Sequence, residues 1–397
     1  MRKVHILGSG GREHAIGWAF RRCGFEVHYY PGNAGTAKDG VNHSYDGLET
    51  VKGIEKGLVI PGSEKYLVDG VANVSEMVFG PKAEVARLEG SKVFAKEFMR
   101  RHGIRTARFE VVHSPEELPD KLRNFSPPYV LKADGLAGGK GVLILEDVNE
   151  AIEKGSKLMS GELLKGVKGP LVIDEFLKGE ELSAMALING SDFVLLPFVR
   201  DYKKLRDGDG GPNTGGMGSW GPVEVPAKTV EAIEELVHRT LWALDREGYT
   251  YRGFLYLGLM LVDGEPFILE YNVRLGDPET EVVVLLDPER FVDNILKAFE
   301  GSKMGEFNPR GYAVDVVLAS EGYPDSPRKG QEITMPEEGV YFFAGVSQVN
   351  SKLVVSGGRV IHSMGAGGTK DEARRDAYLN AEKVEFPGKY YRRDIAL

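Results

Sequence analysis

The sequence predicts an α/β fold that begins with a parallel β-sheet. Four short apolar runs, at residues 4–7, 25–30, 58–60 and 77–79, have the length and composition of buried strands. A glycine-rich turn follows the first run, and residues 15–22 have helical character. This alternation of strand, loop and helix favours a parallel sheet with helices on both faces. At 397 residues the chain exceeds one ordinary core, so we expect two to four domains.

Further elements follow the N-terminal unit, which we expect to end near Glu89. Ser91 is a candidate cap for a helix that ends at Gly103. Apolar residues at three- and four-residue spacing between 230 and 244 predict an amphipathic helix. The "DGE" turn predicts a hairpin between residues 254–262 and 266–272, whereas the Gly, Pro, Asp and Asn content of residues 203–221 predicts a loop. The remaining predicted elements are strands at 109–113, 129–132, 142–146, 171–176 and 182–188, a helix at 150–159, strands from residue 312 and a helix at 371–383.

Composition excludes several classes of protein. The formal charge is −9 and no basic stripe is visible, which argues against nucleic-acid binding. Cys23 is the only cysteine, so an intramolecular disulfide framework and a multi-cysteine zinc site are excluded. The apolar run near the N-terminus is too short for a signal peptide, and the longest run, residues 254–262, is too short to span a bilayer. We expect a cytoplasmic protein that does not associate with membranes.

The first loop, "GSGGRE", resembles a dinucleotide fingerprint but fails two of its conditions. Glu13 occupies the third glycine position, and the second strand ends in "YYPGN" without the acid that would bind a ribose hydroxyl. A hydride-transfer enzyme is therefore disfavoured. A glycine loop before a helix N-terminus suits one phosphate monoester. A tight turn without a ligand fits this loop equally well.

The stretch "KADGLAGGKGV" at residues 132–142 is not a Walker A loop. Lys140 is followed by glycine rather than Ser or Thr, and no glycine lies five residues before Gly139. Lys132 lies at the end of a predicted strand, Lys140 lies inside the loop, and a second strand follows. This pattern predicts a hairpin lid that closes over phosphates, with a mobile surface hairpin as the alternative.

Residues 267–281, "FILEYNVRLGDPETE", carry the pattern of a metal and phosphate site. In an extended chain Glu270, Asn272 and Arg274 point to one face. A carboxylate and an amide oxygen are hard ligands suited to Mg²⁺, and an arginine beside them neutralises charge on a transferring phosphoryl group. A solvated sheet face is the alternative. The sequence contains no GxSxG elbow, and Cys23 is expected to be structural, so covalent catalysis by a side-chain nucleophile is disfavoured.

Taken in order, these stretches resemble a known family. "GSGGREHA", "PGNAGT", "LEGSK", "KADGLAGGKGV", "GPNTGGMG", "GFLYLGLM" and "EYNVRLGDPET" together resemble the phosphoribosylamine–glycine ligases (glycinamide ribonucleotide synthetases) of the ATP-grasp superfamily. The resemblance extends from residue 2 to about residue 380. It implies a Rossmann-like domain at 1–90, an α+β ATP-grasp domain at 91–311 with a lid at about 110–185, and a small C-terminal α/β domain at 312–397.

The resemblance also implies site residues that spacing alone does not supply. The "PGNAGT" turn matches the loop expected to bind 5-phosphoribosylamine, and "GPNTGGMG" with Asp277 matches the region facing glycine and an acyl phosphate. Catalytic roles are implied for Arg274, Lys132 and Asp277. ATP contacts are implied for Lys92, Lys132, Gly138, Gly139, Lys140, Glu175, Leu177 and Glu181. Substrate contacts are implied for Gly10, Gly11, Arg12, Glu13, Asn33, Gly35, Thr36, Glu64, Asn213, Thr214, Gly215, Gly216 and Met217, and Mg²⁺ or Mn²⁺ ligation for Glu270 and Asn272.

The implied reaction joins glycine to 5-phosphoribosylamine through a glycyl phosphate, with ATP as co-substrate, in purine biosynthesis. The alternatives are another ATP-grasp carboxylate–amine ligase or carboxylase of purine metabolism, and a nucleotide-binding sensor without catalysis. Three departures from the family pattern bear on the sites: "DYKK" at 201–204 replaces "DHKR", "GSEKYL" at 62–67 replaces "GPEAPL", and Gly138 replaces a common alanine. We expect a monomer, with a dimer as the alternative.

Overall fold

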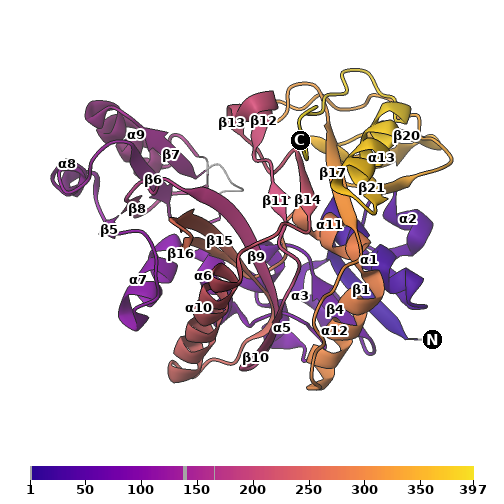
Figure 1. Ribbon diagram of the computed structural model, residues 1–397, viewed down its shortest axis with the longest axis horizontal. Helices are drawn as coiled ribbons and strands as arrows, with labels where there is room; N and C mark the ends of the chain where they lie inside the picture. Colours follow the sequence, from indigo (N-terminus) through magenta and orange to yellow (C-terminus); the bar gives the residue numbers. More distant parts are fainter. Residues whose placement is uncertain (1, 137–140, 165) are drawn as a thin grey trace.

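The computed structural model describes residues 2–136, 141–164 and 166–397, which form three regions around a central sheet (Figure 1). A lid region projects to the left of Figure 1, and the C-terminal region lies at the upper right. The N-terminal strands and helices lie beneath the C-terminal region in this view. The predicted α/β class is confirmed.

The N-terminal region contains the predicted parallel sheet. Its strand order is β3-β2-β1-β4, and every neighbouring pair is parallel. The strands are β1 (Lys3–Gly8), β2 (Glu26–Pro31), β3 (Val41–Asn42) and β4 (Leu58–Pro61). The helices are α1 (Gly11–Arg22), α2 (Thr36–Asp39), α3 (Gly47–Lys52), α4 (Glu64–Val68), α5 (Val71–Val74) and α6 (Ala83–Gly90).

The strand predicted at residues 77–79 is wrong. Only Val78 pairs with the sheet, through a single parallel bridge to Val59. A turn at Glu76 and Met77 precedes it, and a bend at Gly80 follows. The bridge is made by two hydrogen bonds, in which Met77 O accepts from the N–H of Val59 at 2.9 Å and the N–H of Phe79 donates to Val59 O at 2.8 Å, and the pairing extends no further.

The lid region is a four-stranded antiparallel sheet with a separate core. Its order is β5-β8-β6-β7. The strands are β5 (Phe109–Val112), β6 (Tyr129–Ala133), β7 (Val142–Leu145) and β8 (Leu171–Asp174), and the helical segments are η1 (Pro115–Glu117), α8 (Leu118–Leu122) and α9 (Val148–Ser160). Leu118, Leu131, Ala151 and Ile173 belong to a hydrophobic cluster made only of residues from this region. The lid thus packs as a unit of its own.

The central sheet has the order β10-β9-β15-β16. Its strands are β9 (Glu180–Asn189), β10 (Asp192–Leu195), β15 (Arg252–Val262) and β16 (Glu265–Asn272), flanked by α7 (Lys92–His102) and α10 (Ala227–Arg246). The predicted hairpin between β15 and β16 and the predicted helix at 230–244 are both confirmed. Ile233, Val237 and Leu241 of α10 join Leu257 and Ile268 in one buried cluster, which explains the helix's apolar stripe.

The C-terminal region is a five-stranded sheet of order β11-β14-β17-β21-β18, covered by α13 (Lys370–Lys383). Its strands are β11 (Arg200–Asp201), β14 (Gly218–Gly221), β17 (Tyr312–Ala319), β18 (Val340–Phe343) and β21 (Arg359–Gly367). Two hairpins extend from it, β12 (Lys204–Arg206) with β13 (Gly210–Asn213), and β19 (Val346–Val349) with β20 (Lys352–Val355). The connecting helices are η2 (Asp207–Asp209), α11 (Glu279–Leu286) and α12 (Pro288–Glu300).

The loop predicted at residues 203–221 is wrong for most of its length. β12 and β13 form a hairpin there, and β14 lies inside the five-stranded sheet between β11 and β17. Glycine is needed at residue 218 because its φ is +154° and a side chain would lie 2.5 Å from the carbonyl oxygen of Asp315. The glycines that obscured the strand in the sequence thus allow close contact between strands.

Candidate active site

Glu270, Asn272 and Arg274 come at every second position where β16 ends. Arg274 Nη2 donates to Asn272 Oδ1 at 3.0 Å, so these two side chains lie on one side of the strand, as their spacing predicts. The side-chain carboxylate of Glu270 has no hydrogen bond or ion pair within the described residues. Burial would raise the pKa of Glu270, but Lys203 and Lys132 lower it overall, so the group is an ionised carboxylate. An unpaired carboxylate beside an amide oxygen that keeps a second lone pair fits a Mg²⁺ or Mn²⁺ ion.

Arg274 is fixed by two carboxylates from the N-terminal region. Its Nη2 lies 2.9 Å from Glu89 Oε1, and its Nε lies 3.4 Å from Glu64 Oε2. The second oxygen of Glu89 accepts from the backbone N–H of Val273 at 2.8 Å. The structure therefore brings Glu64, a predicted substrate contact, to the predicted catalytic arginine. Because two carboxylates hold its planar guanidinium group, the side chain of Arg274 has a fixed orientation.

Lys132 lies at the end of β6 and makes a buried ion pair that the sequence did not indicate. Its Nζ is 2.7 Å from Asp174 Oδ2 at the end of β8, and it donates to the carbonyl oxygen of Leu269 at 3.1 Å. Lys96 of α7 reaches the same Asp174 oxygen at 2.8 Å. Burial and the positive charge of Lys132 together lower the pKa of Lys96 to about 8, against the opposing effect of Asp174. One carboxylate thus holds two buried lysines beside the strand that carries Glu270.

The remaining predicted ATP contacts lie around the lid. Lys92 Nζ donates to the carbonyl oxygen of Gly135 at 3.4 Å, which places this lysine at the base of the glycine-rich hairpin. Gly138, Gly139 and Lys140 lie outside the described residues.

Glu175, Leu177 and Glu181 follow β8 along the chain that leads from the lid to the central sheet. The N–H of Glu175 donates to the carbonyl oxygen of Arg108 at 2.8 Å. Leu177 is half-buried, and Glu181 is exposed with its Oε2 atom 3.5 Å from Lys203 Nζ. Lys203 also acts electrostatically on Glu270. Lys203 therefore interacts both with Glu181, the predicted ribose contact, and with Glu270, the predicted metal ligand.

The first turn of α1 is closed by its own side chains. Glu13 Oε2 accepts from the N–H of Gly10, and Glu13 Oε1 lies 2.8 Å from Arg12 Nε. Arg12 also donates to the carbonyl oxygen of Leu275 at 2.9 Å. Both charged side chains are buried. The carboxylate of Glu13 thus already accepts a hydrogen bond from one of the N–H groups that a phosphate at this helix N-terminus would use.

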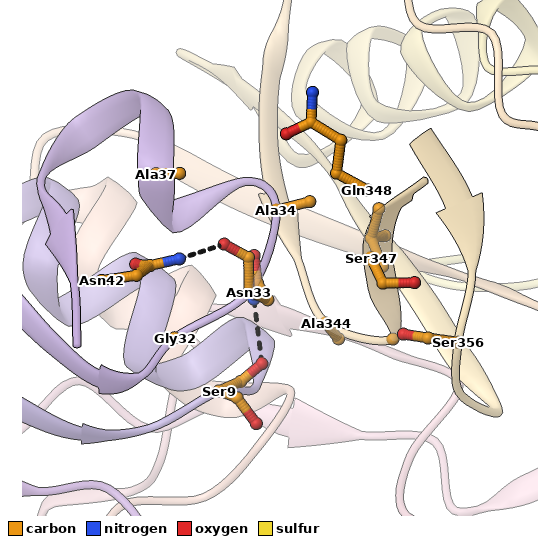
Figure 2. A pocket seen from close by; sticks show the side chains of 12 residues that line it. Ser9, Gly32, Asn33, Ala34, Ala37, Asn42, Ala344, Ser347, Gln348 and Ser356 are labelled. Carbon is orange, nitrogen blue, oxygen red and sulfur yellow. Dashed lines mark hydrogen bonds between the residues drawn. The ribbon is translucent and has the colours of Figure 1, made fainter. Parts of the chain in front are cut away.

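Asn33 joins the N-terminal and C-terminal regions beside a cavity of about 550 Å³ (Figure 2). Its Nδ2 donates to the carbonyl oxygens of Ser9 at 2.9 Å and Phe343 at 2.6 Å. Its Oδ1 accepts from the N–H groups of Gly35 and Thr36. The cavity is lined by Ser9, Gly32, Asn33, Ala34, Ala37, Asn42, Ala344, Gly345, Val346, Ser347, Gln348 and Ser356. Its hydroxyl, amide and backbone groups suit a polar ligand rather than an apolar one.

The glycine-rich loop after β13 is held by Arg359 of the C-terminal sheet. Arg359 Nη1 donates to the carbonyl oxygens of Gly215 at 2.7 Å and Asp277 at 2.8 Å, and lies 3.0 Å from Asp277 Oδ1. Asn213 and Gly215 are exposed, and Thr214 is half-buried. Met217 is fully buried, and its backbone N–H and carbonyl oxygen are hydrogen-bonded to Tyr202 and Val317, at 2.8 Å and 3.1 Å. The loop and Asp277 therefore lie together, as the resemblance implies.

Comparison with known proteins finds one family along the whole chain. Residues 2–89 match the phosphoribosylglycinamide synthetase N domain, residues 90–280 its ATP-grasp (A) domain and residues 313–397 its C domain. The chain belongs to the phosphoribosylglycinamide synthetase family. The resemblance seen in the sequence and the predicted ATP-grasp fold are both confirmed.

Individual members of the phosphoribosylglycinamide synthetase family agree with this assignment. The chain is 69% identical to a phosphoribosylamine–glycine ligase of Thermotoga maritima over 396 residues, covering 100% of this chain and 99% of the relative. It is 39% identical to a phosphoribosylamine–glycine ligase of Clostridium acetobutylicum, covering 99% of each. The crystal structure of phosphoribosylamine–glycine ligase from Thermotoga maritima superposes with a TM-score of 0.97 at 66% identity, covering 99% of this chain and 100% of that one.

A more distant structure shares only the fold. The biotin carboxylase domain of the Hydrogenobacter thermophilus 2-oxoglutarate carboxylase superposes with a TM-score of 0.75 at 15% identity, covering 98% of this chain and 91% of that chain. This agrees with the ATP-grasp architecture of the phosphoribosylglycinamide synthetase family. Within the described part of the chain, none of the helices is both long and apolar enough to cross a membrane.

Sequence reasoning missed several charged residues that hold the site of this family member together. Asp174, Glu89 and Arg359 contact predicted site residues, and Lys96 contacts Asp174; Glu89 lies within the "LEGSK" motif, but the sequence analysis gave none of the four a role. Asp174 offered the clearest signal, because a charged residue at the end of an apolar run of β8 is costly to bury without a partner. Arg359 offered none, because its partners lie about 80 and 140 residues away in the sequence.

Proposed function

We propose that the protein catalyses the ATP-dependent joining of glycine to 5-phosphoribosylamine, with glycinamide ribonucleotide, ADP and phosphate as products. The full-length match to three consecutive domains of one family, with a 69% identical phosphoribosylamine–glycine ligase, carries this conclusion. The geometry supports it, because lysine, arginine and carboxylate groups suited to phosphoryl transfer converge where the lid meets β16.

In the first step, a carboxylate oxygen of glycine attacks the γ-phosphorus of ATP, and ADP leaves. The proposed roles of Lys92 and Lys132 are to contact the phosphates, and that of Arg274 is to stabilise charge on the transferring group. Asp174 supports this role of Lys132 by anchoring its ammonium group. Because phosphoryl transfer depends mainly on positioning and electrostatics, the fixed arginine and lysine can act by their charge, and the reaction requires no side-chain nucleophile.

We assign the adenosine half of ATP to the segment after β8. Glu175 and Leu177 are the proposed backbone contacts to adenine, and Glu181 is the proposed contact to the ribose hydroxyls. After the glycine-rich hairpin the chain continues into β7, which pairs with β6. This supports the proposal that the hairpin is a lid over the phosphates. Gly138, Gly139 and Lys140 complete this lid in the proposal.

In the second step, the amine nitrogen of phosphoribosylamine attacks the carbonyl carbon of the glycyl phosphate. Phosphate leaves, and the amine loses a proton. We assign the binding of phosphoribosylamine to the turn around Asn33, to the start of α1 and to Glu64. We assign glycine and its acyl phosphate to Asp277 and to the loop at residues 213–217. Arg359 contacts both Asp277 and Gly215 of this loop, which supports the assignment of glycine and its acyl phosphate to this place.

A divalent ion fits the pair Glu270 and Asn272, as the unpaired carboxylate of Glu270 and the second lone pair of Asn272 Oδ1 indicate. When bound, Mg²⁺ or Mn²⁺ would lower the negative charge on the phosphates of ATP. Glu270 and Asn272 would hold it, and Arg274 orients Asn272 through its hydrogen bond. We further propose that the protein acts as a monomer, and that it acts in the cytoplasm, which the single cysteine supports.

The test is an ADP-release assay in which ATP, glycine and phosphoribosylamine are omitted in turn. ADP release should require all three, and glycinamide ribonucleotide should form in equal amount. Glu270→Ala should reduce ADP release at least a thousandfold while the circular dichroism spectrum stays unchanged. Glu265→Ala is the matched control, since Glu265 lies on the same strand and forms ion pairs with Arg105 and Lys228 at the exposed surface. ADP release that does not depend on glycine would refute the proposed reaction, and full activity of Glu270→Ala would refute the metal assignment.

A further inference from the structure

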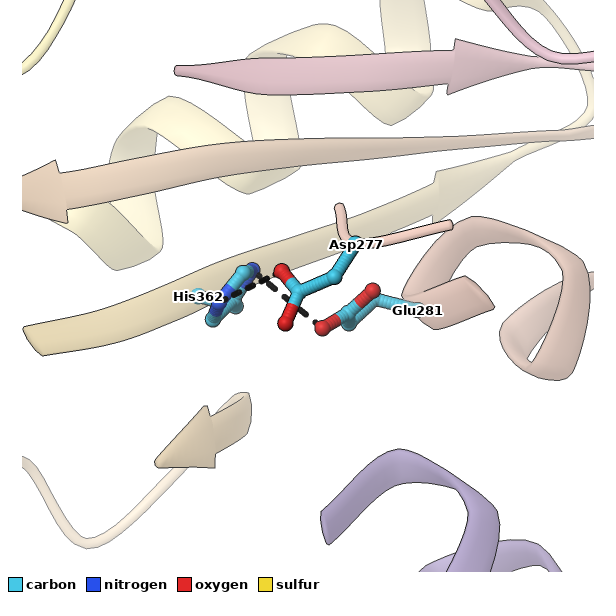
Figure 3. Close-up of side chains that lie close together, drawn as sticks. All are labelled: Asp277, Glu281 and His362. Atoms are coloured by element: carbon cyan, nitrogen blue, oxygen red, sulfur yellow. Dashed lines mark ion pairs between the residues drawn. The ribbon is translucent and has the colours of Figure 1, made fainter. Parts of the chain in front are cut away.

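A buried group of acids surrounds His362 behind the loop that carries Asp277 (Figure 3). His362 lies on β21, Glu281 on α11 and Asp315 on β17, and all three are fully buried. Asp277 belongs to the loop after β16, and its side chain is 11% exposed. Three segments far apart in the sequence therefore direct acids and an imidazole to one point.

Most of the polar atoms at this point lack hydrogen bonds. Both oxygens of Glu281 and Nε2 of His362 are buried and form no hydrogen bond within the described residues, whereas Oδ1 of Asp277 is in an ion pair with Arg359 at 3.0 Å. Leaving a buried polar atom unpaired costs about 1 to 3 kcal/mol, and more when the group is charged. Several such atoms in contact with one another indicate that a ligand binds among them.

His362 has the arrangement found in metal ligands. Its Nδ1 lies 2.6 Å from Asp315 Oδ2 and hydrogen-bonds to it, which fixes the ring and leaves Nε2 free to act as a ligand. Nε2 lies 3.6 Å from Asp277 Oδ1, and Glu281 Oε1 lies 3.6 Å from the ring nitrogen Nδ1. One ligand atom from each of Asp277, Glu281 and His362 lies within 4.8 Å of the others. Donor atoms that share one ion lie about 3 to 4 Å apart, since each is about 2.1 Å from it. Small side-chain movements therefore suffice.

The charges around this point also favour a divalent cation. With a neutral imidazole, the carboxylates of Asp277, Glu281 and Asp315 carry three negative charges, and Arg359 supplies one positive charge. The net charge of these groups is therefore −2, and neutrality requires two further positive charges in a place with almost no access to water. A divalent ion or two protons satisfies this demand.

We propose that Asp277, Glu281 and His362 form a second divalent-cation site, separate from Glu270 and Asn272. One imidazole and two carboxylates suit a transition-metal ion such as Zn²⁺ or Mn²⁺ better than Mg²⁺, which prefers oxygen ligands alone. Asp315 orients the histidine and is not a ligand.

The position of this site suggests a structural role beside the start of α1. A side chain at Gly11 would lie 2.4 Å from His362 Cδ2 and 2.8 Å from Glu281 Oε1, so α1 approaches the site at van der Waals distance. An ion held there ties β21 of the C-terminal sheet to α11 and to the loop carrying Asp277. This ties the C-terminal region to the segment that we assign to glycine. The site itself does not depend on the proposed reaction, because it rests on the unpaired atoms.

Retained metal tests the proposal. Protein stripped with a chelator is incubated with Zn²⁺ or Mn²⁺ without nucleotide, passed through a desalting column and measured by mass spectrometry of the metal. Wild type and Glu270→Ala should each retain one ion per chain, whereas His362→Gln and Glu281→Gln should retain less than a tenth of that. Circular dichroism establishes that the variants are folded. Wild type that retains no ion, or His362→Gln that retains as much as wild type, overturns the proposal in favour of a cluster that holds protons only.

A second measurement avoids variants altogether. Crystals of the wild-type protein soaked in Zn²⁺ should give an anomalous peak within about 2.2 Å of His362 Nε2. A peak only beside Glu270, or only at the surface, overturns the proposal even if the variants prove unstable. Because neither readout uses enzyme activity, failure of this proposal is distinct from failure of the proposed reaction.

Discussion

Replacement of Asp174 by asparagine tests the reasoning about the buried ion pairs most directly. The substitution keeps the shape of the side chain and removes only its charge. Asp174 is 2% exposed, and its Oδ2 lies 2.7 Å from Lys132 Nζ and 2.8 Å from Lys96 Nζ. Asp174→Asn therefore leaves two buried ammonium groups without a counter-ion.

The size of the effect follows from these distances. At an effective dielectric constant of about 20, a pair of unit charges at this separation attracts by about 6 kcal/mol, most of which is offset by desolvation. Removing one partner of a buried pair costs about 3 to 5 kcal/mol. The lower end applies here, because Lys96, whose pKa is already lowered to about 8, can lose its proton. In a unit of roughly 200 residues, about 3 kcal/mol corresponds to a fall in Tm of about 6 to 12 °C.

Differential scanning calorimetry at pH 7 measures this change, with two controls. Asp120→Asn removes the charge from an exposed pair with Arg123 in the same lid and should change Tm by less than about 2 °C. Lys96→Met removes one of the two lysines and leaves the pair of Asp174 with Lys132, so it should cost less than about 1 kcal/mol. If Asp174→Asn unfolds at the same temperature as Asp120→Asn, the carboxylate does not hold the two lysines as we describe.

Three further substitutions give independent tests. Asn33→Ala removes four hydrogen bonds, including the one to Phe343, and should lower the free energy of unfolding by about 2 kcal/mol and raise KM for phosphoribosylamine at least tenfold. Chemical denaturation and initial rates measure these two effects. Gly11→Ala places a methyl group 2.4 Å from His362 Cδ2, so overpacking should cost about 1 to 3 kcal/mol in the same denaturation experiment. His5 has its pKa lowered to about 4, mainly by burial. Its neutral form thus contributes stability that is complete above about pH 6.5 and is lost as the pH falls towards 4, and His5→Gln should remove about 2 kcal/mol of this pH dependence in urea titrations.

Each of these tests has a control on the same chain. Asn124→Ala removes an exposed asparagine whose amide contacts Glu110 and should leave stability within about 0.5 kcal/mol of wild type. Gly53→Ala adds a methyl group whose nearest neighbours lie at 3.5 Å, an ordinary contact distance. If Gly11→Ala behaves like Gly53→Ala, the close approach of α1 to His362 is not as tight as described. Equal pH dependence in wild type and His5→Gln would exclude His5 as the titrating group.

Local patterns in the sequence accounted for much of the fold and part of the candidate site. The spacing of Ile233, Val237 and Leu241 predicted α10, and the period-two order of Asn272 and Arg274 predicted a shared side, which their hydrogen bond confirms. These predictions hold because helical and strand periodicities are properties of neighbouring residues. The strands at residues 204–221 were missed because glycine has low strand propensity, and what favours a strand there is its packing against β17.

The sequence by itself determined the family, the α/β class and the residue types of the phosphate site, since motifs such as "KADGLAGGKGV" and "EYNVRLGDPET" are continuous in the chain. Only the tertiary structure decided which partner each site residue contacts. Asp174 meets Lys132, Asn33 meets the carbonyl of Phe343, and Arg359 meets Asp277 across separations of about 40 to 310 residues. A buried charge requires a partner, but its identity depends on which strand ends the fold brings together.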